Sequence, residues 1–236
     1  SIENVLDELH YIRENFLLSY VIYLDDTFTI NHKWVRDFCR VYKEKFRIPF
    51  SLHARAETIN EQMLHELAQA GCAHITFGVE SGSPRVRREV MKRRISNERM
   101  IKAFQWSKDA GILTTANYII GTPTETRSDM DETLALHEQI NPHDFGYFVF
   151  YPYPGTPMYQ YCKDRGLLPD NISALPANHR TSVLLHDVLS AADIEEYYQK
   201  FTLLRERSYL ERYGQYLNDT GQLTVSEQMT DIAQTG

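Results

Sequence analysis

The sequence predicts an α/β protein whose strands run parallel, and three observations indicate this fold class. Short apolar runs typical of strands alternate with stretches of helical periodicity over residues 2–165. Strands separated by helices form parallel βαβ units with right-handed crossovers. The chain has 236 residues, of which 42% are hydrophobic and 24% charged. This composition is that of a globular domain and excludes fibrous and disordered classes.

Five strands are predicted from apolar runs bounded by polar or glycine-containing turns. They span residues 20–24, 50–55, 74–79, 113–120 and 145–151. The pattern fits an open doubly wound sheet or a full or partial (β/α) barrel. Because the chain opens on a helical pattern, we expect one further strand to precede Ser1.

Seven stretches of helical periodicity separate and flank these strands, and Gly71 and Gly111 each follow a helix end, where a left-handed residue is common. They span residues 2–17, 32–46, 60–70, 84–91, 96–110, 126–140 and 157–165.

The final third departs from the alternation. Residues 167–187 form a loop-rich connection, and a long helix follows over 190–217, with Ser190 as its N-cap. We therefore expect a mainly helical extension at the C-terminus. The expected division is a barrel over residues 1–166, a loop and helix over 167–218, and a polar tail, predicted to be disordered, over 219–236.

Charge and cysteine content narrow the function classes. The net charge of −7 argues against a nucleic-acid surface, which needs clustered cations. The basic run over residues 85–94 is interpreted as a solvated helix face with one functional cation. No stretch is apolar enough for a membrane span, and the start lacks the features of a signal peptide. Cys39, Cys72 and Cys162 suit reduced thiols, so we expect a cytoplasmic protein.

Polar or ionisable side chains lie on or directly after the predicted strands. Because the carboxyl ends of parallel strands face one side, where ligands bind, we expect these side chains to line one pocket. This pattern favours the partial barrel. They are Asp25 and Asp26, His53 and Arg55, Glu80 and Ser81, Asn117, and Tyr151.

Three of these loops allow more than one interpretation. Glu80, at the mouth of a buried strand, could bind the paired hydroxyls of a ribose or form an ion pair with a neighbouring arginine such as Arg55. Gly121 could bring the backbone close to a flat ring or form an ordinary turn. Asp25 and Asp26 could hold a metal, an amine or a ribose, or lie in solvent.

Four segments, in this order, resemble the radical S-adenosylmethionine superfamily. They are Tyr23–Thr29, Phe77–Ser83, Tyr118–Thr126 and Tyr151–Thr156. The resemblance covers residues 1–166 and is strongest to the branch that includes cobalamin-binding methyltransferases and anaerobic magnesium-protoporphyrin ester cyclases. It implies a partial (β/α)6 barrel in which a [4Fe-4S] cluster, fed by a reductant, cleaves S-adenosylmethionine to a 5′-deoxyadenosyl radical that acts on a small-molecule substrate.

The resemblance also assigns roles by position. Asp25 and Asp26 would contact the methionine amino group, and Lys92 its carboxylate. Glu80, Ser81 and Asn117 would hold the ribose. The adenine would be framed by Ile119, Gly121, Tyr151 and Pro152, with His53 and Arg55 as further pocket residues.

The chain departs from the family in one respect. The hallmark C-x3-C-x2-C triplet, whose thiolates bind the cluster, is absent. We expect the three cysteines to lie on different faces and to bind no metal. The sequence is therefore interpreted as a fragment of a longer enzyme, and we expect the fragment to be inactive alone. The sequence does not determine whether the full-length protein uses cobalamin. The alternatives are a non-catalytic barrel that binds a nucleotide or a partner, and a lyase or hydrolase using Glu80 and Asp25 as acid and base.

Overall fold

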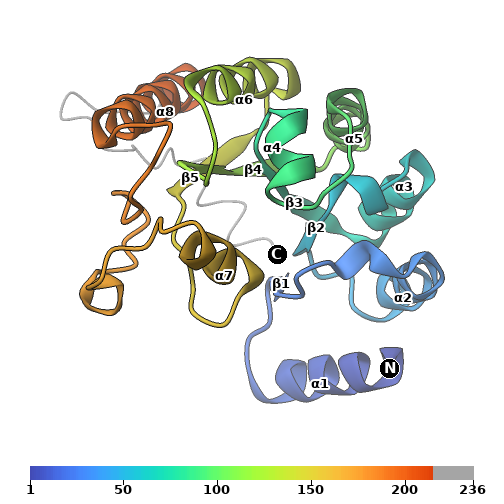
Figure 1. The fold of residues 1–236 in the computed structure, drawn as a ribbon. Helices are drawn as coiled ribbons and strands as arrows, with labels where there is room; N and C mark the ends of the chain where they lie inside the picture. The colour runs from blue at the N-terminus through green and yellow to red at the C-terminus, as the bar shows by residue number, and fades with distance from the viewer. Residues whose placement is uncertain (215–236) are drawn as a thin grey trace.

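Five parallel strands form a single curved sheet in the computed structural model, which describes residues 1–214 (Figure 1). The strands pair in the order of the sequence, each with its neighbour along the chain. This order is that of a barrel wall, because a doubly wound sheet reverses its strand order near the middle. The strands are β1 (Val21–Tyr23), β2 (Phe50–Ala54), β3 (Cys72–Glu80), β4 (Leu113–Ile120) and β5 (Asp144–Val149).

Helices cover the outer face of this sheet. Figure 1 shows α2, α3, α5 and α6 along that face and α7 on the open side of the arc. The long α8 packs against α6, β4 and β5. The helices are α1 (Ile2–Asn15), α2 (His32–Lys45), α3 (Glu61–Ala70), α4 (Pro84–Glu89), α5 (Asn97–Asp109), α6 (Arg127–Ile140), α7 (Pro157–Asp164) and α8 (Ala191–Tyr213).

Alternating burial along the central strands gives the sheet two chemically different faces. Leu52, Phe77 and Tyr118 are fully buried and point toward the helices. Their neighbours His53, Thr76 and Asn117, one residue out of phase, are partly exposed on the concave face. Because successive strand residues point to opposite faces, the concave face is free to carry polar groups.

Glycine and serine mark helix ends where the sequence predicts them. Gly71 adopts a left-handed φ of 102° directly after α3, a conformation that glycine reaches without steric cost. Ser190 caps α8 by accepting a hydrogen bond from the Asp193 N–H, and the Asp193 side chain accepts from the Ser190 N–H in return. A second capping box joins Thr126 and Asp129 at the start of α6.

The structure differs from the sequence prediction in detail. Strand β5 ends at Val149, whose N–H donates to the carbonyl of His179 in the following connection. Short 3-10 helices at Phe28–Ile30, Ala56–Thr58 and Ile172–Ala174 were not predicted. The expected end of the last helix at residue 217 and the polar tail over 219–236 lie outside the described residues. No helix within residues 1–214 is long and apolar enough to cross a membrane.

Candidate functional site

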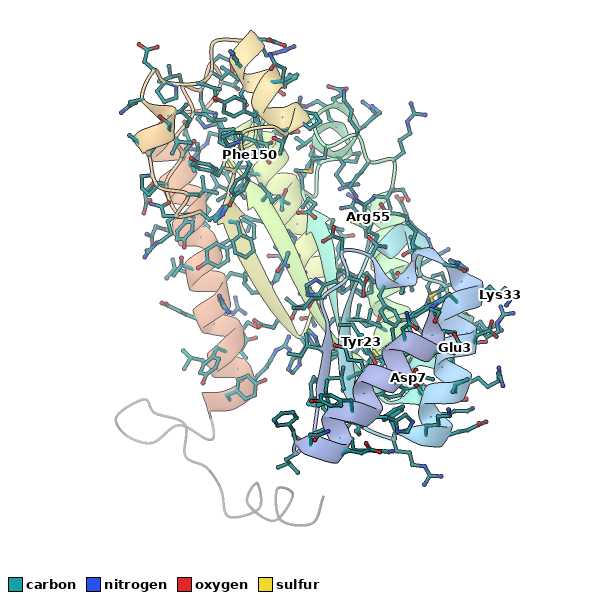
Figure 2. The ribbon with its side chains drawn as sticks, turned by 90° about the horizontal axis from the view of Figure 1, so that it is seen from below. Glu3, Asp7, Tyr23, Lys33, Arg55 and Phe150 are labelled. Carbon is teal, nitrogen blue, oxygen red and sulfur yellow. The ribbon has the colours of Figure 1, made fainter. Side chains whose placement is uncertain are left out.

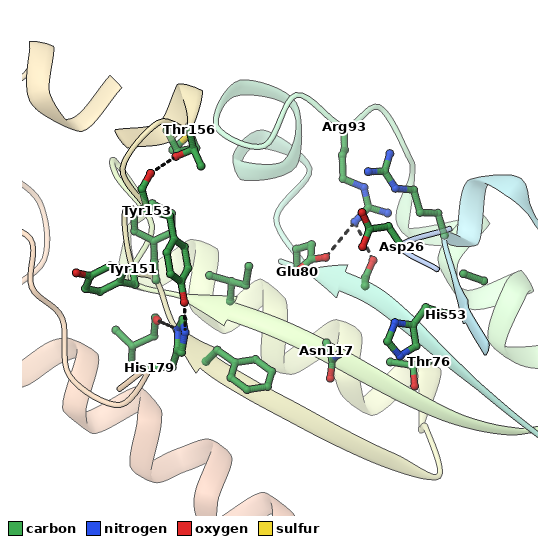
Figure 3. Close-up of a pocket in the computed structure, with 18 residues that line it drawn as sticks. Asp26, His53, Thr76, Glu80, Arg93, Asn117, Tyr151, Tyr153, Thr156 and His179 are labelled. Atoms are coloured by element: carbon green, nitrogen blue, oxygen red, sulfur yellow. Dashed lines mark hydrogen bonds and ion pairs between the residues drawn. The ribbon is translucent and has the colours of Figure 1, made fainter. Parts of the chain in front are cut away.

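A cavity of about 670 Å³ opens on the concave face, at the carboxyl ends of β2 to β5. Figure 3 shows two chemically different sides. Charged and polar side chains, including Asp26, His53, Glu80 and Arg93, lie on one side, and Tyr151, Tyr153 and His179 lie on the other. The view in Figure 2 places Arg55 and Phe150 near the strand ends, away from Glu3 and Asp7 on α1. A cavity of this size suits a small ligand held by a few polar groups.

Glu80 lies at the end of β3 in an unusual backbone conformation. Its φ is 68°, a left-handed value that is uncommon for residues other than glycine, and the pairing with β4 shifts register between Gly78 and Glu80. The carboxylate folds back over Gly78, where a Cβ atom would lie 2.3 Å from Glu80 Oε1. Glycine at position 78 is therefore required for this position of the carboxylate.

Arg93 lies beside Glu80 and fixes the polar side of the cavity. Its guanidinium donates to both carboxylate oxygens of Glu57, at 3.1 and 2.8 Å, and to the carbonyl of Gly78 at 2.7 Å. The distance from Arg93 Nη1 to Glu80 Oε1 is 3.7 Å, which is an ion pair without a hydrogen bond.

The Glu80 carboxylate is short of hydrogen-bond donors. Burial raises its pKa, while the positive charges of Arg93 and Arg55 act to lower it. Within the described residues no group donates a hydrogen bond to it. The side chain is 26% exposed, so its hydrogen-bond donors come from water or from a ligand in the cavity. The site therefore suits a ligand with hydroxyl or ammonium groups at this position.

Asn117 presents a second polar group from the neighbouring strand β4. Figure 3 shows its side chain in the cavity, and it makes no hydrogen bond within residues 1–214. A Cβ atom on Gly146, opposite it on β5, would lie 2.7 Å from Asn117 Oδ1. Gly146 thus leaves room for the amide, which can both donate and accept.

Comparison with known proteins identifies the fold family. The profile of the Radical SAM superfamily matches residues 1–137, more than half of the chain. The chain belongs to the radical SAM superfamily. It is 31% identical over 169 residues to uncharacterized methyltransferase PH0819 of Pyrococcus horikoshii. It is 25% identical over 166 residues to the anaerobic magnesium-protoporphyrin IX monomethyl ester cyclase of Rubrivivax gelatinosus.

These two alignments cover 71% and 69% of the chain but only 37% and 30% of the relatives. The chain therefore spans about a third of the length of the curated relatives it matches. Among solved structures, the radical S-adenosylmethionine methyltransferase TsrM from Kitasatospora setae has a TM-score of 0.63 at 18% identity, over 94% of this chain and 42% of its own. Coproporphyrinogen III oxidase from Escherichia coli has a TM-score of 0.63 at 16% identity, over 99% of this chain and 51% of its own. These structures show the shared fold.

The structure brings most of the family-matched residues together. They include side chains from the loop after β1 and from strands β2, β3 and β4, which are far apart in the sequence. Those that line the cavity are Asp26, His53, Arg55, Glu80, Asn117, Ile119 and Tyr151.

Other family-matched residues lie outside the cavity lining. Ser81 is fully buried and faces α6, with its hydroxyl 3.3 Å from Thr133 Oγ1. Lys92 is exposed and donates to the carbonyl of Glu89, so its ammonium points away from the cavity. Gly121, with a φ of 72°, faces α8, where a Cβ atom would lie 3.2 Å from Ile194. Asp25 and Pro152 are not among the lining residues either.

Several lining residues were missed by the sequence analysis. Arg93 belongs to the basic run over residues 85–94, which the sequence analysis interprets as a solvated helix face with one functional cation. At Arg87 and Arg93 the side chain is not solvated. Arg93 has a side chain only 10% exposed, and Arg87 is fully buried with its guanidinium bonded to the carbonyls of Ser81 and Ile95. His179 comes from the loop-rich connection and has no local sequence signal. Tyr153 lies in a quoted motif but was given no role.

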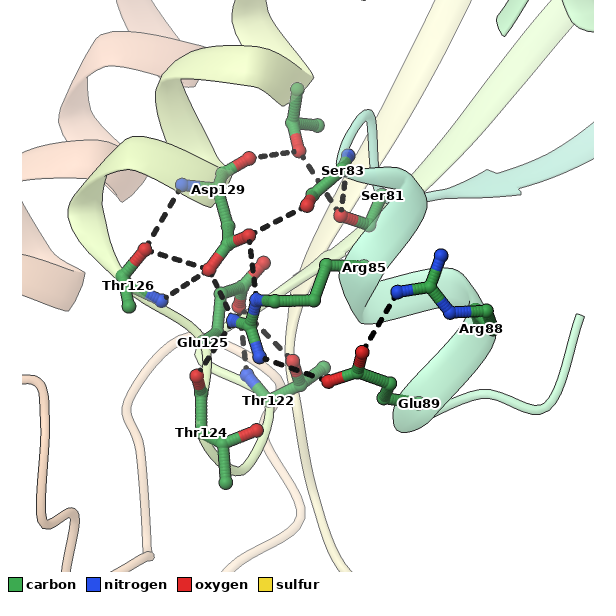
Figure 4. Close-up of polar contacts among 11 residues, drawn as sticks. Ser81, Ser83, Arg85, Arg88, Glu89, Thr122, Thr124, Glu125, Thr126 and Asp129 are labelled. Carbon is green, nitrogen blue, oxygen red and sulfur yellow. Dashed lines mark hydrogen bonds and ion pairs between the residues drawn. The ribbon is translucent and has the colours of Figure 1, made fainter. Parts of the chain in front are cut away.

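A buried polar network joins the loop after β3 to the start of α6 (Figure 4). Asp129 accepts hydrogen bonds from Ser83 Oγ at 2.6 Å and from the Thr126 N–H at 2.8 Å. Arg85 forms an ion pair with Asp129 and donates to the carbonyl of Thr124 at 2.8 Å. The network therefore ties together two loops that leave the sheet beside the cavity.

The cysteines do not fit the iron–sulfur cluster of the family. Cys39 and Cys72 lie in the main core, whereas Cys162 lies in a separate apolar cluster with Leu167 and Leu184. Burial raises the pKa of Cys39 and of Cys72 to about 12, which disfavours the thiolates that bind iron. Within residues 1–214 no three Cys, His, Asp or Glu side chains are grouped to hold a metal ion.

Proposed function

We propose that this chain is the S-adenosylmethionine-binding part of a radical SAM enzyme. The observation that carries the proposal is the Glu80 carboxylate, which lies at the cavity mouth without a hydrogen-bond donor in the described chain. The two hydroxyls of a ribose would supply the missing donors. Asn117, on the adjacent strand, is the second ribose contact in this proposal.

The remaining parts of the ligand are assigned by charge. Asp26 is proposed for the methionine ammonium, and Arg93 replaces Lys92 for the carboxylate because only Arg93 lines the cavity. Ile119 and Tyr151 are proposed for the adenine ring, with His53 and Arg55 closing the polar side.

Other parts of the full reaction lie outside these residues. Reductive cleavage of S-adenosylmethionine would be supplied by a [4Fe-4S] cluster whose ligands this chain does not contain. We propose that the longer protein provides them and acts on a small-molecule substrate; two of its relatives are named as a methyltransferase and a magnesium-protoporphyrin IX monomethyl ester cyclase. Cobalamin is proposed only for that longer protein, because it is present in the TsrM structure.

Binding of S-adenosylhomocysteine to the purified chain tests the proposal. Isothermal titration calorimetry of the Glu80→Gln variant should show affinity about 10- to 100-fold weaker than that of the wild type, since a charge-assisted hydrogen bond is lost. Glu44→Gln, an exposed change on α2, is the matched control and should leave affinity unchanged. Equal affinity of the Glu80→Gln variant and the wild type would remove Glu80 from the ribose role.

A non-catalytic binding barrel is the second candidate, and the misplaced cysteines favour it. It predicts the same binding result. The two candidate functions predict different gene sequences upstream of Ser1. A C-x3-C-x2-C triplet encoded there supports the enzyme, and its absence supports the binding protein. The lyase or hydrolase is not proposed, because Asp25 does not line the cavity with Glu80.

A further inference from the structure

The side of the cavity opposite Glu80 is an aromatic wall, which we define as Phe148, Phe150, Tyr153 and His179, and Tyr151 borders it. His179 joins two of its other rings: the ring centroids of Tyr153 and His179 are 5.9 Å apart, and those of Phe148 and His179 are 6.1 Å apart. Phe148 and Tyr153 nevertheless remain 42% and 49% exposed. Exposed rings that line a cavity are a surface for a flat apolar ligand.

His179 is held against the end of β5 by two backbone-directed contacts. The Val149 N–H donates to the His179 carbonyl at 2.8 Å, and His179 Nδ1 lies 3.3 Å from the Val149 carbonyl oxygen. His179 itself has a left-handed φ of 54°, which this double contact maintains. The imidazole is thus a fixed part of the wall although it comes from a distant loop.

These contacts determine how Tyr153 can interact with a ligand. A carbonyl oxygen only accepts, so the contact between Nδ1 and the Val149 carbonyl favours the tautomer in which Nδ1 carries the proton and Nε2 is an acceptor. Tyr153 Oη lies 2.8 Å from Nε2, so the phenol donates its proton to the imidazole. The lone pairs of the phenol oxygen remain, and they accept a hydrogen bond. The wall therefore offers a hydrogen-bond acceptor to a ligand that carries an N–H or O–H group.

We propose that the aromatic wall is the subsite of a second ligand, a flat conjugated ring whose edge bears an N–H or O–H donor. This inference rests on the proposed function, in which the charged side holds S-adenosylmethionine. A single adenine has two faces and is already assigned to Ile119 and Tyr151. The ring surface that Phe148, Phe150, Tyr153 and His179 present is larger than that adenine can cover. The wall also carries no carboxylate or guanidinium that would bind the charged methionine group.

β-Naphthol and its methyl ether are the probes, because they share the ring system and only the naphthol has an O–H donor. Titrated into the chain saturated with S-adenosylhomocysteine, naphthol should bind about three- to ten-fold more tightly than the ether, the effect of one hydrogen bond. Tyr153→Phe should remove this preference while leaving binding of the ether unchanged. Tyr209→Phe, on α8 outside the wall, should keep the preference.

Three results would overturn the subsite. The first is mutual displacement of naphthol and S-adenosylhomocysteine, which would make the wall the adenine site. The second is equal affinity of the wild type for naphthol and its ether. The third is a preference for naphthol that survives in the Tyr153→Phe variant. The Glu80→Gln variant separates the two proposals, since it should weaken the binding of S-adenosylhomocysteine and leave the affinity for naphthol unchanged. Naphthol binding with the expected preference in a chain that does not bind S-adenosylhomocysteine would refute the proposed function alone.

Discussion

Glu125 is a buried carboxylate whose two oxygens have different surroundings. Oε2 accepts a hydrogen bond from the Thr122 N–H at 2.9 Å. Oε1 is buried and has no partner within the described residues. Burial raises the pKa of Glu125 to about 7. The turn at the start of α6 therefore favours the protonated acid, which is unusual for a glutamate in a loop.

The Glu125→Gln variant should gain stability relative to the wild type at alkaline pH. Because the folded pKa of about 7 exceeds the ordinary value of 4.5, the carboxyl stabilises the fold fully only below about pH 4.5, and this contribution is lost as pH rises through about 7. Glutamine stays neutral, so urea unfolding near pH 8 should show a gain of about 2–3 kcal/mol over the wild type. No gain should appear near pH 4, nor at either pH for the exposed control Glu138→Gln. A gain that is independent of pH would contradict the assignment.

At the scale of elements, Asp129 joins the loop after β3 to the start of α6. Hydrogen bonds from Arg85, Ser83 and Thr126 overcome the effect of burial and lower the pKa of Asp129 to about 2. Glu80, the last residue of β3, and Thr124, in the loop before α6, both have left-handed φ values, of 68° and 63°. Such conformations persist when surrounding contacts hold them.

Asp129→Asn should therefore lower the free energy of unfolding by about 2 kcal/mol at neutral pH, since charge-assisted hydrogen bonds are lost. The difference should shrink as pH falls through the ordinary value of 3.8 toward about 2, where the wild-type carboxylate also becomes protonated. Chemical denaturation at several pH values measures this. Glu132→Gln, exposed on the same helix, is the control. A loss that stays constant down to the lowest pH would show that charge has no part in the contact.

At the scale of the whole molecule, the sheet is open at β1. Within residues 1–214 this strand pairs only with β2, and its neighbourhood is apolar and exposed: Leu17 is 96%, Ile22 62% and Leu24 75% exposed. An exposed apolar edge strand is a place where another strand can pair. A strand of the longer protein proposed above would pair at this edge.

Anaerobic reconstitution of this chain with iron and sulfide should yield no stoichiometric cluster, because its three thiols are buried in two separate clusters. Visible absorbance and iron content measure the outcome. A chain extended upstream through a cysteine triplet should bind the cluster. A stable, stoichiometric cluster in the present chain, lost in the Cys39→Ser variant, would contradict the placement of the thiols.

The sequence alone determined the order and type of the α-helices and strands and the end of the sheet at which the cavity opens. These follow from local periodicity and from the rule that parallel strands present their carboxyl ends together. The positions of Glu80 and Asn117 at the cavity could be predicted because each residue lies on a strand or at its end.

Only the tertiary structure decided which of the remaining polar residues face the cavity. Lys92 has a left-handed φ of 56°, and the chain turns there so that Arg93 points inward instead. His179 reaches the wall through hydrogen bonds to Val149, 30 positions earlier in the chain. Outside regular elements, side-chain direction depends on single backbone angles and on distant contacts, and neither produces a periodic pattern that a sequence can reveal.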